Sequence, residues 1–329
     1  MLKKIILHLI IFLGIAQAQA NTNENRTLNF AVEYTSHATS FYYAEAKDLF
    51  ANENLNVNDV KVYVSGAAVA TAFVKEHFDV AYMCLVPAII TYANGAVPIK
   101  IIAGTHLDGY GIVANSKKIK SLKDLENEGV KIGVGAMGTV TSFIQEVIIE
   151  KANLDPNKAR QNFVKMNSSK QIMALKAGIV DAVVLPEHFV SLAASLDGME
   201  ILANSSELWK DLQGSVIVVS QKMLTESPEI VEKIKKVNRE AIDAINADNT
   251  EASVIVAQNL NIHQDRIKHQ TKSPDIDLTV TPQIAKSSIE NLILTDTILP
   301  EAVQEVIDKM FQYGFIQNSF DASEILAIN

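Results

Sequence analysis

The chain contains 329 residues, of which 48% are hydrophobic and 20% are charged, and its formal net charge is −9. A chain of this length can form two domains with substantial cores, so folding needs no disulfide or metal. The negative charge argues against binding to nucleic acid or to anionic lipid, and the single cysteine, Cys84, excludes an intrachain disulfide.

The first 20 residues have the pattern of a secretory signal peptide. The segment begins with the basic stretch MLKK, continues with an apolar run at 5–15, and ends with the small-x-small sequence AQA at 18–20. The apolar run is short for a membrane span. We therefore expect cleavage after Ala20 and an exported, periplasmic protein. An uncleaved N-terminal anchor is the alternative.

Strands alternate with helices through most of the chain, which predicts βαβ units and parallel sheets. Strands are expected at 28–32, 60–64, 78–82, 99–103, 111–115, 131–134, 162–166, 181–185, 200–203 and 216–220. Helices are expected at 41–51, 67–75, 86–93, 139–152, 168–177 and 186–196. After residue 220 only helices are predicted, with the first one carrying a single apolar stripe, at 228–246, 250–260, 282–293 and 300–313.

This order of elements predicts an α/β fold of two lobes with a helical C-terminal part. We expect lobe I to comprise 21–114 and 216–329, and lobe II to be the inserted segment 115–215. The strands at 111–115 and 216–220 would be the two crossings between the lobes. Two crossings form a hinge, because few residues join the lobes and rotation about them is easy.

Residues 131–143 (KIGVGAMGTVTSF) contain Gly133-x-Gly135-x-x-Gly138, the spacing of a dinucleotide-binding loop. However, the motif is not in the first βα unit, and the next strand, NFVKM, does not end in an acidic residue. We therefore expect no nicotinamide or flavin, and no other cofactor. Free N–H groups at a helix N-terminus still bind negative or dipolar groups, so Gly138 and Thr139 can contact a ligand. The alternative is that the glycines only permit a tight turn.

Short motifs follow one another in a distinctive order between residues 28 and 314. They are TSHATS at 35–40, VSGA at 64–67, FDVA at 78–81, MCL at 83–85, IKSLKDL at 119–125, KIGV at 131–134, ALKAGIVDA at 174–182 and PE at 186–187. Together they resemble the nitrate/sulfonate/taurine family of periplasmic ABC-transporter substrate-binding proteins, which includes binders of thiamine precursors. The resemblance implies a type II periplasmic-binding-protein fold, with two doubly wound sheets joined by a two-segment hinge. It also implies a small-molecule ligand and a cognate ABC permease in the inner membrane.

Open α/β sheets bind ligands beyond the carboxyl ends of their strands, and the loops at these positions are rich in serine, threonine and glycine. The predicted ligand-binding residues are Thr35, Ser36, His37, Tyr42, Ser65, Gly66, Ala67, Cys84, Leu85, Asp108, Tyr110, Ala136, Gly138, Thr139, Thr141 and Glu187. Cys84 lies in an apolar context and is expected to pack rather than react. We predict no catalytic residue and no metal ligand, since the seven histidines show no metal-ligand spacing.

The charges near the predicted strand ends bear on the type of ligand. None of the four arginines lies there, so no bidentate clamp for sulfonate, nitrate or phosphate is evident. Glu187 can pair with an amine or a protonated heterocycle, or it is a solvated residue of a helix's first turn. Tyr42 and Tyr110 suit planar or cationic ligands. We expect a monomer that captures a small organic solute containing an amine, a heterocycle or a sulfonate.

Two other functions stay open at this point. The same two-lobed fold is similar to menaquinone-pathway dehydratases, which the signal peptide disfavours, and to a thiamine-pyrimidine synthase, whose cysteine-rich motif one cysteine cannot supply. A third reading is a sensory subunit that binds a ligand and docks on a membrane receptor. A binding protein without catalysis is the reading that the motifs favour.

Overall fold

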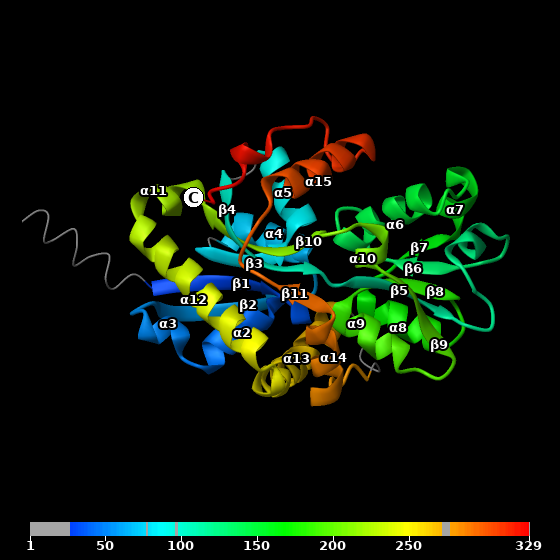
Figure 1. The fold of residues 1–329 in the computed structure, drawn as a ribbon, viewed down its shortest axis with the longest axis horizontal. Coiled ribbons are helices and arrows are strands. Elements are labelled where there is room, and N and C mark those ends of the chain that lie inside the picture. Colours follow the sequence, from blue (N-terminus) through cyan, green and yellow to red (C-terminus); the bar gives the residue numbers. More distant parts are fainter. Residues whose placement is uncertain (1–26, 77, 96–97, 272–276, 329) are drawn as a thin grey trace, which may run out of the picture.

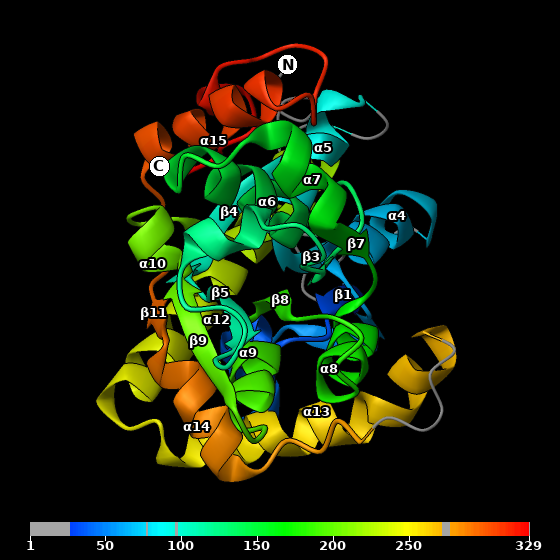
Figure 2. The ribbon, with the colours of Figure 1, turned by 90° about the vertical axis from the view of Figure 1, so that its right-hand side faces the viewer.

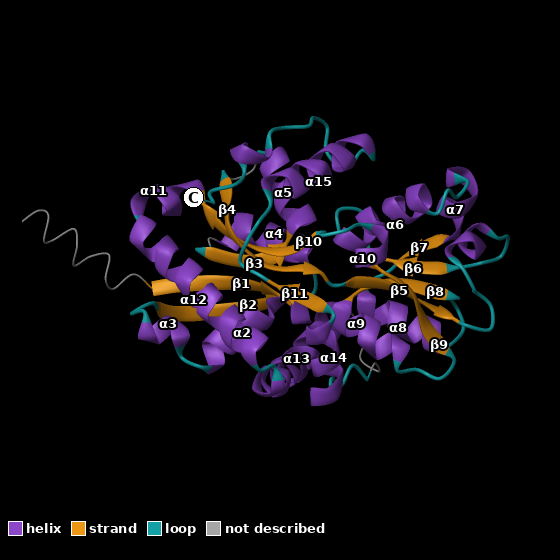
Figure 3. Cartoon of the chain, in the orientation of Figure 1, coloured by secondary structure: helices purple, strands orange, loops and turns teal. Residues whose placement is uncertain are grey.

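The computed structural model describes residues 27–76, 78–95, 98–271 and 277–328 (Figure 1). The predicted signal peptide, residues 1–20, lies outside the described residues. Within these ranges no helix combines the length and the apolar character needed to cross a membrane. Two β-sheets lie side by side along the long axis, with helices above and below them (Figures 1 and 3), which confirms the predicted α/β class.

In the described part of the chain, the first sheet has six strands in the order β11-β4-β10-β3-β1-β2. Their bounds are β1 Thr27–Glu33, β2 Asn56–Tyr63, β3 Val80–Cys84, β4 Ile99–Asp108, β10 Gln213–Ser220 and β11 Leu292–Leu294. Strand β1 is parallel to β2 and β3, whereas β10 is antiparallel to β3 and β4. The carboxyl ends of β1, β2 and β3 therefore meet at one edge of the sheet.

The second sheet, over the same described residues, has five strands in the order β7-β6-β8-β5-β9. Their bounds are β5 Tyr110–Asn115, β6 Ile132–Val134, β7 Phe163–Lys165, β8 Ala182–Pro186 and β9 Met199–Asn204. Strand β6 is parallel to β7 and β8, and β5 is antiparallel to β8 and β9. The carboxyl ends of β6, β7 and β8 likewise share one edge.

Helices connect the strands and cover the sheets. Their bounds are α2 Thr39–Ala46, α3 Leu49–Asn52, α4 Gly66–Glu76, α5 Leu85–Ala93, α6 Val140–Lys151, α7 Pro156–Asn162, α8 Ser168–Lys176, α9 Glu187–Ala194, α10 Ser205–Leu208, α11 Gln221–Glu226, α12 Pro228–Ala247, α13 Thr250–Thr271, α14 Pro282–Glu290 and α15 Pro300–Gln312. Short 3₁₀ helices are η1 Ser36–Ala38, η2 Leu122–Glu126 and η3 Ala322–Glu324. Helices α13 and α14 lie on the opposite side of the molecule from α15 (Figures 1 and 2), and α14 packs against α9.

Two apolar layers hold the molecule together, and each contains strand residues of both sheets. Side chains alternate between them, so that Phe30 and Val32 of β1 lie in one layer and Ala31 lies in the other. Burial on both faces explains why these strands read as continuous apolar runs. The predicted stripe of α12 packs into the first layer, which confirms it; its residues are Ile230, Ile234, Val237, Ala241 and Ile245.

The chain passes between the sheets at places that differ from the predicted crossings. The first is the turn between β4 and β5 at Asp108 and Gly109, and the second is the segment 205–212 between β9 and β10. The predicted crossing at 111–115 lies inside β5, which has β8 on one edge and β9 on the other. Pairing on both edges satisfies the backbone N–H and C=O groups that a bare crossing would leave exposed. The division into lobes I and II stays a prediction.

Two helix predictions were wrong in detail. The predicted helix at 41–51 is broken into α2 and α3, because Asp48 adopts a left-handed conformation with a φ of 55°. The predicted helix at 282–293 ends earlier, and β11 follows it and pairs with β4. The C-terminal part is therefore not purely helical, since the edge of β4 recruits a short strand from it.

The outer edge of β4 is also paired with the last residues of the chain. The backbone N–H of Ile101 donates to the carbonyl of Ile325 at 2.9 Å, and that of Ala327 donates back to Ile101 at 2.8 Å. The backbone N–H of Gly104 donates to the carbonyl of Asp296 at 3.0 Å. Residues close to the C-terminus thus cover an edge that would otherwise stay open.

Candidate ligand-binding site

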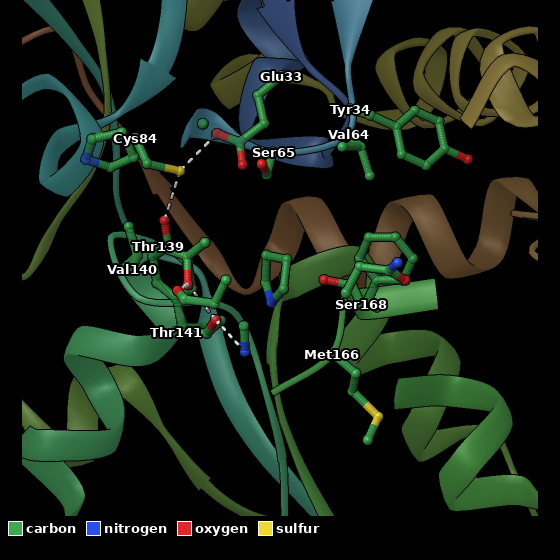
Figure 4. Close-up of a pocket in the computed structure, with 18 of the residues that line it drawn as sticks. Glu33, Tyr34, Val64, Ser65, Cys84, Thr139, Val140, Thr141, Met166 and Ser168 are labelled. Atoms are coloured by element: carbon green, nitrogen blue, oxygen red, sulfur yellow. Dashed lines mark hydrogen bonds between the residues drawn. The ribbon is translucent and has the colours of Figure 1, made fainter. Parts of the chain in front are cut away.

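A cavity of about 210 Å³ lies between the two sheets. The lining residues from the loops of the first sheet are Glu33, Tyr34, Val64, Ser65, Gly66, Cys84 and Pro87. Those from the second sheet and its loops are Tyr110, Gly135, Ala136, Thr139, Val140, Thr141, Lys165, Met166, Asn167, Ser168, Pro186 and Phe189. Figure 4 shows Glu33 and Ser65 on one side of the cavity, and Thr139, Val140 and Thr141 on the other.

Strand direction explains why these residues converge. The cavity is built at the carboxyl ends of β1, β2 and β3 and of β6, β7 and β8, the edge at which α/β sheets bind ligands. Helices α4, α5, α6, α8 and α9 follow these strands and begin at the cavity. Side chains cap the N-termini of two of these helices, α6 and α8. Thr139 Oγ1 accepts a hydrogen bond from the Ser142 N–H at 3.3 Å, and Asn167 Oδ1 accepts one from the Lys170 N–H at 2.9 Å.

A buried chain of polar groups forms one end of the cavity. The Cys84 thiol donates to Glu33 Oε2 with an Sγ–O distance of 2.8 Å, and the Tyr110 hydroxyl donates to Cys84 Sγ at 3.0 Å (Figure 4). Burial raises the pKa of Cys84 well above its ordinary value, and the nearby charge of Glu33 raises it further. The group is therefore a thiol at neutral pH and a weak nucleophile.

The Glu33 carboxylate is the acceptor at one end of this chain of hydrogen bonds. It accepts a hydrogen bond from Cys84 Sγ, and the nearby backbone N–H groups of Gly66 and Cys84 lower its pKa. Burial raises the pKa of Glu33 above its ordinary value, and the hydrogen bonds oppose that rise. The absence of a side chain at Gly66 makes the approach possible, since a Cβ there would lie 3.0 Å from Glu33 Oε2 and 2.9 Å from Pro87 Cγ.

His37 does not line the cavity, but its ring lies next to the thiol of Cys84. Its Nε2 donates to the Gly109 carbonyl at 2.7 Å, and its Nδ1 lies 3.9 Å from Cys84 Sγ. Burial lowers the pKa of His37 well below its ordinary value, and the proximity of His106 lowers it further. The ring is therefore neutral, and it ties the first strand loop to the turn between the sheets.

The reactivity of Cys84 gives a test of this arrangement. In the Glu33→Gln protein, the pH at which iodoacetamide begins to alkylate Cys84 rapidly is expected to fall, because removal of the carboxylate charge lowers the pKa of the thiol. The measurement is the alkylation rate across a pH series, followed by mass spectrometry of the intact protein. An unchanged pH–rate profile would show that Glu33 and Cys84 do not interact.

The opposite wall contains the glycine-rich stretch that resembles a dinucleotide loop. The Gly135 N–H donates to Thr141 Oγ1 at 3.2 Å, and the hydroxyls of Thr139 and Thr141 are 3.1 Å apart. A Cβ at Gly135 would overlap both hydroxyl oxygens, so the glycine allows them to stand together at the cavity. Gly138 has a φ of 90° and lies in the turn before α6. The glycines thus shape a hydroxyl-bearing wall.

The structure brings part of the predicted set together. The predicted residues that line the cavity are Ser65, Gly66, Cys84, Tyr110, Ala136, Thr139 and Thr141. Those that do not line it are Thr35, Ser36, His37, Tyr42, Ala67, Leu85, Asp108, Gly138 and Glu187. Of these, Ala67 and Gly138 border a neighbouring surface hollow. Leu85 is fully buried in the core, and the Tyr42 hydroxyl donates to the Glu33 carbonyl at 3.4 Å.

Other predicted residues join the two sheets instead of lining the cavity. Glu187 is 1% exposed, and its Oε1 accepts from Asn291 Nδ2 at 3.0 Å, so it is not a solvated first-turn residue. Burial raises the pKa of Glu187 to about 7. The Ser36 N–H donates to His188 Nδ1 at 3.3 Å. Asp108 has a φ of 62° in the turn between the sheets.

Several lining residues were not predicted from sequence. They are Glu33, Tyr34, Val64, Pro87, Gly135, Val140, Lys165, Met166, Asn167, Ser168, Pro186 and Phe189. Glu33 was not predicted to line the site because the strand that contains it was expected to end at residue 32. Residues 166–168 follow β7, whose end was not counted among the ligand loops. Extending the strand-end rule to every parallel strand would have found both groups.

Among the described residues, no group of three or more histidine, cysteine, aspartate or glutamate side chains is arranged to hold a metal ion. The lining of the cavity offers hydroxyls, aromatic rings, one buried carboxylate, the ammonium group of Lys165 and backbone N–H groups. Such a set suits reversible recognition of a small organic molecule.

Comparison with known protein families and solved structures identifies the family and the fold of the chain. Residues 21–261 match the NMT1-like family. The fold is similar to that of the alkanesulfonate-binding protein of Xanthomonas axonopodis pv. citri bound to MOPS, with a TM-score of 0.74, 16% identity, and coverage of 92% of this chain and 98% of that one. The periplasmic aliphatic sulphonate-binding protein of Escherichia coli gives a TM-score of 0.72 at 15% identity, with 91% of each chain covered.

The periplasmic nitrate-binding protein of Synechocystis PCC 6803 is similar over 92% of this chain and 86% of that one, with a TM-score of 0.70 and 12% identity. A comparison with curated proteins gave no match. These identities are low, so the solved structures establish the fold, and the family match covers most of the chain. The chain therefore belongs to the NMT1-like family and has the periplasmic-binding-protein fold that its sequence motifs predicted.

Proposed function

We propose that this protein is the solute-binding component of an ABC importer, exported to the periplasm after removal of residues 1–20. The observation that carries the proposal is the cavity between the two sheets, at the edge where open α/β folds bind small molecules. The fold shared with sulfonate- and nitrate-binding proteins supports the same role. The solute is a small organic molecule, received by a monomer and passed to a membrane permease.

The proposed mechanism is closure of lobe I and lobe II around the solute. The two connecting segments are the turn at Asp108 and Gly109, where both residues have positive φ, and the segment 205–212. Closure hides the solute and forms a surface that the permease can distinguish from the open one. The hydrogen bonds from Asn291 to Glu187 and from Ser36 to His188 join the two sides in the closed arrangement.

We propose binding without catalysis. The one cysteine is a buried thiol whose pKa is raised, and His37 is held neutral with its Nε2 hydrogen committed to a backbone carbonyl. The pair therefore lacks the thiolate that nucleophilic catalysis requires. A sensory role uses the same cavity and closure, and co-purification with a permease or with a receptor distinguishes the two partners.

Closure and occupancy can be tested together. Native mass spectrometry of the purified protein is expected to reveal a retained small molecule, and solution scattering is expected to show a smaller radius of gyration after that molecule is added to stripped protein. The same solute should raise the melting temperature. If the tightly bound solute leaves the radius unchanged, lobe closure is wrong. If no small molecule is retained or stabilises the protein, the binding function is wrong.

A further inference from the structure

The two sides of the cavity differ in charge. Among the described residues that line it, Glu33 is the one acidic side chain and Lys165 is the one basic side chain. Glu33 is 8% exposed, whereas Lys165 is exposed and its Nζ donates to Gln145 Oε1 at 2.6 Å. A ligand that enters the cavity therefore meets a carboxylate away from bulk water, where charge interactions are strong.

No cation of the protein neutralises Glu33 in the described part of the chain, where none of the ion pairs includes it. Its carboxylate accepts a hydrogen bond from the Cys84 thiol and lies near two backbone N–H groups, and all three are dipoles without a net charge. A buried carboxylate without a positive partner is costly to ionise. A positive group on the ligand would remove that cost.

Glu33 also occupies the places at which an anionic ligand would bind on this side. The N-terminal ends of α4 and α5 would attract negative charge, but the Glu33 carboxylate already lies beside the Gly66 and Cys84 backbone there. A sulfonate or carboxylate brought to the same point would face the Glu33 charge at close range. The first sheet's wall thus disfavours an anion.

Aromatic rings complete a surface for a positive group. Tyr34, Tyr110 and Phe189 line the cavity with Glu33, and ring faces attract cations in desolvated sites. The Tyr34 hydroxyl is buried and has no hydrogen-bond partner among the described residues. The aromatic rings are an observation independent of the Glu33 carboxylate, and they also favour a positively charged group on the ligand.

We infer that the solute carries a positively charged nitrogen, in an ammonium group or a protonated heterocycle, and that Glu33 is the residue that holds it. This inference rests on the proposed solute-binding function and narrows it to a cationic or zwitterionic solute. The sequence suggested Glu187 as the partner of an amine. In the structure Glu187 accepts hydrogen bonds from Ser191 and Asn291 and lies outside the cavity.

The pairing makes affinity depend on pH. The titratable groups around Glu33 are Cys84 of β3, Tyr110 of β5 and Tyr42 of α2, and His37 of η1 lies next to Cys84. Burial raises the pKa of Cys84, Tyr110 and Tyr42, and it lowers the pKa of His37, so all four stay neutral around neutral pH. Glu33 is the group that titrates, and protonation removes its charge. Affinity for a cation is therefore expected to fall as the pH drops below the raised pKa of Glu33.

The test uses probes that share a hydrocarbon group and differ in charge. Benzylamine, benzyl alcohol and phenylmethanesulfonate are compared by thermal shift and calorimetry, as are propylamine and propanesulfonate, with taurine as a zwitterion. The amines and taurine are expected to stabilise the protein more than their neutral or anionic counterparts. Glu33→Gln is expected to weaken amine binding by at least about 30-fold, the loss typical of a broken buried charge pair. It should also abolish the pH dependence.

The control is Glu45→Gln, the same substitution at an exposed residue of α2 outside the cavity, which should leave amine affinity unchanged. Circular dichroism confirms that both variants fold. Stabilisation by the sulfonates alone, or amine affinity retained in Glu33→Gln, overturns the assignment of Glu33 and leaves the binding function standing. Stabilisation by none of the probes, together with no solute retained on the native protein, contradicts the binding function itself.

Discussion

Replacement of Gly214 by alanine is expected to lower the free energy of unfolding by about 3 kcal/mol, the cost of severe overpacking. A Cβ at this position would overlap the imidazole ring of His106 and would lie 2.8 Å from its Nε2. The ring cannot move aside, because it is fully buried, its Nδ1 donates to the Leu107 carbonyl at 3.1 Å, and its centroid is 4.4 Å from that of His37. Thermal and urea denaturation measure the loss.

Gly111→Ala is the matched control for this substitution. Gly111 is also a strand residue near the passage between the sheets, but a Cβ there would lie 3.2 Å from Val190 Cγ1, and the neighbour needs to shift only slightly. We expect a loss below about 1 kcal/mol. A double variant with His106→Ala should recover part of the Gly214→Ala loss, since the clash partner is removed. Equal losses in the two glycine variants would contradict the clash with His106.

Gly135→Ala is expected to weaken binding of the solute retained on the native protein by at least about tenfold. The new Cβ would overlap Thr139 Oγ1 and Thr141 Oγ1, so at least one hydroxyl must leave the cavity wall. The hydrogen bond from the Gly135 N–H to Thr141 would be lost with it. Calorimetry with the identified solute measures the change in affinity.

The control for this effect is Gly133→Ala, two residues earlier and within β6. A Cβ there would lie 3.0 Å from Gln171 Cγ and 3.2 Å from Val183 Cγ1, both outside the cavity. This variant should lose stability while it keeps its affinity for the solute. If Gly133→Ala weakens binding as much as Gly135→Ala does, the loss reflects general damage to β6 and not the threonine wall.

The alternation of apolar strands and amphipathic helices was sufficient to predict the fold class and most elements, because burial on both faces leaves a strong pattern in each strand. This pattern did not predict the elements that depend on pairing with distant parts of the chain. Strand β11 has only three residues, and it forms because β4 offers an unpaired edge. The pairing of 111–115 within β5 likewise depends on partners at 182–186 and 199–204.

The candidate site shows the same limit. Three acids lie at or after the ends of predicted strands, Glu33, Asp108 and Glu187, and sequence gives no reason to choose Glu33. Asn291, which is 104 residues from Glu187 along the chain, donates a hydrogen bond to Glu187 and holds it outside the cavity. Glu33 is held at the cavity by Gly66 and Cys84, from two other loops. Contacts of this kind are tertiary, so a local pattern cannot report them.

The pairing of the C-terminal residues with β4 has a consequence for when the protein can fold. Strand β10 lies between β3 and β4, and Ile325 and Ala327 complete the outer edge of β4, so the first sheet needs residues from both ends of the chain. Contacts of such long sequence separation form slowly and late. We therefore expect the nascent chain to stay without its complete native first sheet until residues 325–327 have been synthesised.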